Sequence, residues 1–174
     1  MKKKVLVGFV AALSILFSAC SSGDSTKLTG SAEDVLTKVW TAAEAALGEG
    51  NAPRVETIAV AADQAQQLLG LSGADFNTYV DSAAVSNALI TTSAHEVAVI
   101  KVKNASDAAK VKGLVAAGFD AKRWICVMPD KAATVESGAY ILLVASSTAT
   151  ADAVITAFKD AAGTTGEVNT FFTK

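Results

Sequence analysis

The side chains that could do covalent or acid–base chemistry are few in this chain of 174 residues, which has two cysteines and one histidine. Cys20 lies near the N-terminus and Cys126 in the second half, with His95 between them. A Ser–His–Asp or Cys–His mechanism would have to use His95, which opens an apolar segment beside Glu96. One histidine and one further thiol cannot fill the four ligand positions of a structural zinc site.

Motifs for other catalytic or cofactor chemistry are missing from the sequence. No Gly-x-Ser-x-Gly elbow occurs, and Gly48-Glu49-Gly50 lacks the lysine of a phosphate-binding loop. No ladder of Asp and Asn matches a calcium loop, and the carboxylates are scattered. The sequence therefore predicts a protein that is not an enzyme and that holds no metal or cofactor.

Cys20 lies where a secretory signal peptide would be cleaved. Lysines open the chain, and an apolar stretch of 13 residues follows over 5–17, shorter than the ~20 residues that cross a membrane. Phe17-Ser18-Ala19-Cys20 resembles the lipobox of bacterial lipoproteins, with Phe17 in place of the usual leucine. We therefore expect Cys20 to carry a diacylglyceryl thioether. Its acyl chains, of the palmitate type, would anchor the protein in the membrane.

This interpretation divides the chain into three parts. We expect a lipoprotein signal peptide over 1–19, the lipidated cysteine and a flexible tether over 20–30, and a single domain over 31–174. Such a protein would be extracytoplasmic, on the outer face of the cell membrane. The alternative is an ordinary secreted protein that is cleaved after Ala19.

Charge and cysteine content narrow the function classes. Without the three lysines of the leader, the 15 Lys and Arg fall to 12 against 17 Asp and Glu, a net charge of −5. This balance argues against a nucleic-acid partner. Once Cys20 is lipidated only Cys126 remains, so no intrachain disulfide framework is expected. We expect Cys126 to be a buried, inert thiol, with a reactive thiol as the alternative.

The first half of the chain predicts helices and strands in alternation. Ser31 caps a helix whose apolar residues recur at helical spacing until Gly48, and this spacing places Trp40 in the core rather than on a ligand. The segment 55–62 is ambiguous between a strand and the start of a helix. A short helix over 63–69 ends at Gly70, and a strand is expected over 76–85.

The second half contains a weak repeat. A strand over 96–103 precedes a helix that Gly118 ends, and a hairpin of 132–136 with 140–145 precedes another helix. A shift of 43 residues takes Val99 to Leu142. The pattern predicts an α+β fold, with an antiparallel sheet, helices packed on one face, a strand–strand–helix duplication and a preceding N-terminal helix.

Two charged features could form a surface site. Lys122, Arg123 and Trp124 lie in the segment between the repeats, where a cation beside an indole could grip a carboxylate or a sugar ring. The alternative is a loop whose tryptophan is anchored in the core. Glu96 and Lys101 bracket the central strand, but five residues apart they point to opposite faces. We expect them to be solvated strand ends.

Several segments together resemble a family of mainly Gram-positive bacterial lipoproteins, catalogued as domain of unknown function 4358. They are Leu69-Gly70-Leu71, Phe76-Asn77-Thr78-Tyr79-Val80, Ala94 to Lys103, and Gly138-Ala139-Tyr140-Ile141-Leu142-Leu143-Val144. The resemblance covers residues 31 to 162 and departs from the family over 116–131. It implies the layout of lipobox, tether and α+β domain, and no activity, because none is assigned to the family.

The function that these features predict is a non-catalytic interaction or accessory module at the cell envelope. Its partners would be the membrane, through Cys20, and an envelope protein or a cell-wall component. The alternatives are a small solute-binding lipoprotein and, third, an envelope enzyme.

Overall fold

The computed structural model describes residues 26–89 and 94–174. The predicted signal peptide and Cys20 lie outside the described residues. In chain order the elements are α1 (Ala32–Leu47), β1 (Val55–Ala59), α2 (Ala65–Leu69), α3 (Gly73–Tyr79), β2 (Val80–Ala88), β3 (Glu96–Val102), a short 3₁₀ helix η1 (Ala105–Asp107), α4 (Ala108–Gly118), β4 (Lys131–Ser137), β5 (Tyr140–Ser146), α5 (Thr148–Ala162) and β6 (Val168–Thr173).

The strands form one sheet in the order β1-β2-β3-β5-β4-β6, and every neighbouring pair is antiparallel. The α+β class and the antiparallel sheet are therefore confirmed. The expected hairpin is β4 and β5, which turn at Gly138, where φ is 55°. The central pair is β3 and β5, in which Val99 lies directly opposite Leu142.

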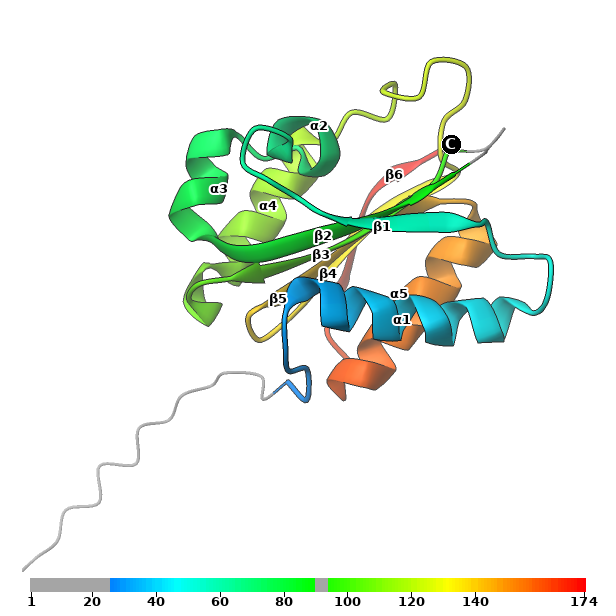
Figure 1. The fold of residues 1–174 in the computed structure, drawn as a ribbon, viewed down its shortest axis with the longest axis horizontal. Coiled ribbons are helices and arrows are strands. Elements are labelled where there is room, and N and C mark those ends of the chain that lie inside the picture. Colours follow the sequence, from blue (N-terminus) through cyan, green and yellow to red (C-terminus); the bar gives the residue numbers. More distant parts are fainter. Residues whose placement is uncertain (1–25, 90–93) are drawn as a thin grey trace, which may run out of the picture.

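The helices cover both faces of the sheet, where the sequence pattern predicted one (Figure 1). Helices α1 and α5 pack on one face, and α2, α3 and α4 pack on the other. The reason is topological. The connections β3-α4-β4 and β5-α5-β6 each join parallel strands across one intervening strand and step the same way along the sheet. Because β3 and β5 run in opposite directions, two right-handed crossovers must place their helices on opposite faces.

The predicted duplication thus holds for the order of the elements along the chain, but not for how they are arranged in space. Val99 and Leu142 do face the same side of the sheet, toward α1 and α5. Their following helices diverge, since Val111 of α4 packs in the cluster on the other face and Val154 of α5 packs on the same face as both strand residues.

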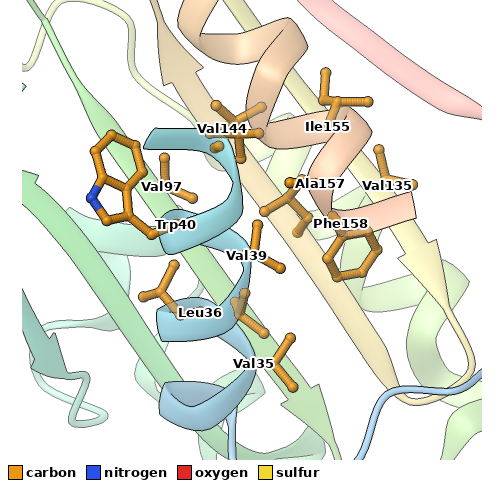
Figure 2. Packing of buried hydrophobic residues seen from close by; sticks show 14 of the residues in the cluster. Val35, Leu36, Val39, Trp40, Val97, Val135, Val144, Ile155, Ala157 and Phe158 are labelled. Carbon is orange, nitrogen blue, oxygen red and sulfur yellow. The ribbon is translucent and has the colours of Figure 1, made fainter. Parts of the chain in front are cut away.

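Helix α1 forms as its sequence predicts. Ser31 and Asp34 form a reciprocal capping box at its start, and the backbone N–H of Gly48 donates to the Glu44 carbonyl at its end. Figure 2 shows its apolar side against the sheet and α5, with Leu36 and Val39 fully buried. Trp40 is only 8% exposed, so its predicted place in the core is confirmed.

Two elements differ from the expected pattern. The strand expected over 76–85 begins only at Val80, because Ser72 caps helix α3 through the Asp75 backbone N–H and carries the helix to Tyr79. Strand β6 was not predicted. It lies at the sheet edge on β4, and its Asn169 and Thr170 obscure any apolar alternation.

One end of the sheet receives the N-terminal segment, and we call it the anchor end. The Lys27 backbone N–H donates to the Ala162 carbonyl. The Gly30 carbonyl accepts hydrogen bonds from Lys101 Nζ and Tyr140 Oη. Leu28 is buried, so part of the segment expected as a flexible tether packs on the fold. No helix in residues 26–89 and 94–174 is long and apolar enough to cross a membrane.

The opposite end of the sheet carries the connection from α4 to β4. We call residues 119–130 the far loop. It joins the sheet where β4 starts and β5 ends, since the Asp130 backbone N–H donates to the Ser146 carbonyl. Figure 1 shows the start of the described chain and the far loop toward opposite ends of the molecule.

Two glycines of α4 should respond oppositely to alanine. A Cβ on Gly118 would lie 2.0 Å from the Gly70 carbonyl oxygen, whereas a Cβ on exposed Gly113 would meet nothing within 4 Å. We expect Gly118→Ala to lower the free energy of unfolding by ~1–3 kcal/mol through overpacking. Gly113→Ala should raise it by ~0.5–1 kcal/mol through helix propensity. Urea unfolding of both variants measures this, and equal effects would contradict the close α2–α4 contact.

Candidate functional site

The far loop exposes apolar side chains to solvent. Ile125 is 98% exposed and Met128 is 39% exposed. Cys126 is exposed too, so the expectation of a buried thiol is wrong. That expectation followed the average behaviour of free cysteines, but this one lies on a loop that leaves the end of the sheet and does not face the core.

A hollow of about 550 Å³ lies between the far loop and the start of α5. Two of the three residues singled out in the sequence, Lys122 and Trp124, contribute to its wall. The full lining is Ala94, Lys122, Trp124, Ile125, Cys126, Val127, Met128, Pro129, Asp130, Ser147 and Lys174. The hollow thus offers an indole, a thiol, apolar side chains and charged groups of both signs.

Arg123 points away from the hollow and into the fold. Its Nη1 donates to the carbonyls of Gln67 (2.9 Å) and Leu68 (3.2 Å), near the C-terminal end of α2. Its Nη2 lies 2.5 Å from Glu96 Oε1. The three residues Lys122 to Trp124 therefore do not act as one surface grip, because the guanidinium is already occupied.

Trp124 packs against the inward-pointing guanidinium. The Arg123 Cζ lies 4.3 Å from the centre of the indole and 5.0 Å from the Phe119 ring. The Trp124 and Phe119 rings are 6.2 Å apart. Trp124 is half-buried, so it both anchors the loop and faces the hollow, which combines the two interpretations that the sequence left open.

Glu96 is buried rather than solvated, which corrects the expectation for this strand end. It is 2% exposed, on the face of the sheet toward α2 and α4. Burial raises the pKa of Glu96 to about 7, although the charge and hydrogen bond of Arg123 lower it. Lys101 lies at the anchor end, where its Nζ is 3.5 Å from Asp81 Oδ2. Glu96 and Lys101 therefore form no common cluster, as predicted.

His95 faces the other side of the sheet from Glu96. Its Nδ1 is 2.9 Å from Ser146 Oγ, and its ring meets Trp40 edge-on at 5.1 Å between centroids. His95 and Ser146 are each 3% exposed, and burial lowers the pKa of the histidine to about 4. Because both side chains are buried, we interpret the pair as structural.

The sequence contained no signal for either buried pair. His95 and Ser146 are 51 residues apart, and Glu96 and Arg123 come from different elements joined only by the fold. Tyr79 lies apart from both, against Lys110 on the anchor side of α4. Within the part of the chain that the structure describes, no three His, Cys, Asp or Glu side chains are placed to hold a metal ion.

A scan against protein families, a search of curated proteins and a search of solved structures each found no match to this chain. The resemblance to domain of unknown function 4358 therefore stays a prediction.

Buried His95 and Glu96 should give the free energy of unfolding opposite dependences on pH. Folding lowers the pKa of His95 from 6.5 to about 4, so its contribution is complete above pH 6.5 and is lost as pH falls toward 4. Folding raises the pKa of Glu96 from 4.5 to about 7, so its contribution is complete below pH 4.5 and is lost as pH rises toward 7.

Single variants separate these opposing slopes. Glu96→Gln removes the contribution of the carboxyl and keeps that of His95. The free energy of unfolding should therefore rise by about 3 kcal/mol as pH increases from 4 to 6.5. His95→Gln leaves the carboxyl alone, and stability should fall between pH 4.5 and 7. Urea titrations at each pH test this, and the same pH profile in both variants would refute the assignment.

Proposed function

We propose that the chain is a lipoprotein anchored through Cys20 on the outer face of a bacterial membrane, and that its domain is a non-catalytic interaction module. The far loop is the surface that meets an envelope protein or a cell-wall component. The proposal is supported by the lipobox-like motif and by the relation of the far loop to the N-terminal segment.

The observation that carries the proposal is that the N-terminal segment and the far loop lie at opposite ends of the sheet. The N-terminal segment is pinned at the anchor end by the contacts of Gly30. The far loop lies beyond the opposite ends of β4 and β5, seven-residue strands that are about 23 Å long at 3.3 Å per residue. Residues 20–25 can span at most about 20 Å. An anchor at Cys20 would therefore hold one end of the domain near the membrane and direct the far loop away from it.

The side chains of the far loop suit protein recognition. Ile125 and Met128 present apolar surface, and the hollow beside them gives a partner side chain a place to insert. Lys122 and Asp130 add charges of both signs to its lining. Binding surfaces usually combine apolar and polar groups in this way.

A second candidate function is binding of a small solute. The hollow of about 550 Å³ falls within the range of roughly 300–1,000 Å³ that small-molecule sites occupy. Trp124 offers a ring for stacking. A thermal-shift screen with sugars, amino acids and short peptides separates this function from protein recognition, because a bound solute raises the melting temperature.

Replacing the proposed lipid-bearing cysteine should release the protein from the membrane. In Cys20→Ser no thioether can form, so the protein should move from the membrane pellet to the soluble fraction and lose the mass of the lipid. Cys126→Ser is the matched control and should stay in the pellet. Equal membrane retention of wild type and Cys20→Ser would contradict the anchor.

Contact through the far loop can be tested in intact cells with the thiol that the loop provides. A thiol-specific photocrosslinker on Cys126 should give a reproducible adduct with one envelope component. Ile125→Ser should abolish this adduct, because the side chain is 98% exposed and contributes little to folding. Leu89→Ser removes an exposed apolar side chain outside the far loop and should leave the adduct intact. Equal adducts in the two variants would refute the assignment of the surface.

A further inference from the structure

The far loop depends on one side chain for its polar attachment. Between residues 121 and 128, the polar contacts with other described residues outside the loop all come from Arg123. The loop is otherwise held at its ends, by the Phe119–Phe171 contact and by Asp130. Trp124 forms part of the wall of the hollow, and its position therefore depends on the position of Arg123.

The partners of Arg123 differ in strength. The carbonyls of Gln67 and Leu68 are neutral, whereas the carboxyl of Glu96 can carry a full charge. All three contacts involve the charged guanidinium, but only the ionised carboxylate adds the attraction between two opposite full charges. Glu96 is thus the partner whose protonation state changes how firmly the guanidinium is held.

The surroundings of Glu96 make Arg123 its only charged partner among the described residues. Its sheet neighbours are Asn87 on β2 and Ala145 on β5, both neutral. Helix α2 offers backbone carbonyls to the guanidinium, and α4 ends against α2, where Gly118 meets Gly70. The charge and hydrogen bonding that act on the Glu96 carboxyl come from Arg123 and from no other titratable group of the described chain.

We propose that Arg123 and Glu96 form a latch that opens in mild acid. The ionised carboxylate holds the far loop against the sheet, and protonating it frees the guanidinium to move toward water, carrying Trp124 away from the wall of the hollow. Arg123 keeps its charge at any physiological pH, so the switch is the carboxyl alone. Protonation also removes the cost of burying a charge, so the core stays folded while the loop loosens.

The latch acts on the surface assigned above to a partner, but its test reads the loop itself and holds whether or not a partner binds. The mature full-length chain is labelled with fluorotryptophan, and its two indoles give separate fluorine NMR resonances. Trp40 packs on the opposite face of the sheet against His95, so its resonance reports whether the fold is intact. The Trp124 resonance reports the loop.

In the unmodified sequence the Trp124 resonance should shift with pH with a midpoint near 7, while the Trp40 resonance stays constant between pH 5 and 8. Glu96→Gln should hold Trp124 at its acid position at every pH. Arg123→Met should release the loop at every pH. Lys122→Met is the matched control, since the side chain of this exposed neighbour makes no hydrogen bond or ion pair with other described residues, and it should titrate like wild type.

A Trp124 resonance that is unchanged by pH and by both latch substitutions, with Trp40 also unchanged, would overturn the latch and assign the loop's position to Phe119 and Asp130. If either substitution disturbs the Trp40 resonance, the pH titration of the unsubstituted chain decides by itself, because it needs no change in the core.

Discussion

The pairing of β3 with β5 at the centre of the sheet is the constraint on which the rest of the structure depends. These strands run antiparallel, and each leads through a helix to a strand two places further along the sheet. With a common right-handed sense, the two crossovers cover opposite faces. The central strands are consequently buried on both sides, and Val97 to Ile100 and Ile141 to Ala145 are all fully inaccessible. Few polar atoms can be tolerated there without a partner.

Two of the polar side chains that enter this core, His95 and Glu96, lie side by side at the start of β3. His95 and Glu96 are adjacent in sequence and point to opposite faces, as successive residues of an extended chain do. Each meets a partner that another part of the chain supplies, Ser146 for the histidine and Arg123 for the carboxyl. Both pairs lie at the end of the sheet that carries the far loop. These two buried pairs thus lie beside the surface that we propose for binding.

The direction of the chain also gives the molecule two distinct ends. The N-terminal segment is tied to β3 and β5 at one end through Lys101 and Tyr140. The far loop leaves from the other end, with Ile125 and Met128 exposed and Arg123 turned inward. A tether at one end and an apolar loop at the other suit a domain that is held at a membrane and reaches outward. The contact between Gly70 and Gly118 lets α2 and α4 meet closely, and Arg123 links the end of α2 to the sheet.

The sequence by itself determined the elements whose signals are local. The cap at Ser31, the stop at Gly48, the short helix ending at Gly70, the hairpin at Gly138 and the helix before Gly163 all follow from side chains and backbone freedom within a few residues. The α+β class followed from these elements. The uninterrupted apolar runs of β3 and β5 also carried a signal for burial on both faces, because a sheet covered on one face alternates.

Only the tertiary structure decided what depends on chain direction and on distant partners. The face that each helix covers depends on the handedness of crossovers, which no local pattern records. The exposure of Cys126, the burial of Glu96 and the inward turn of Arg123 depend on where a loop between two elements comes to rest. Spacing along a chain predicts which residues share a helix or a strand face, but it cannot predict which residues meet when separate elements pack, because those contacts are made through the fold.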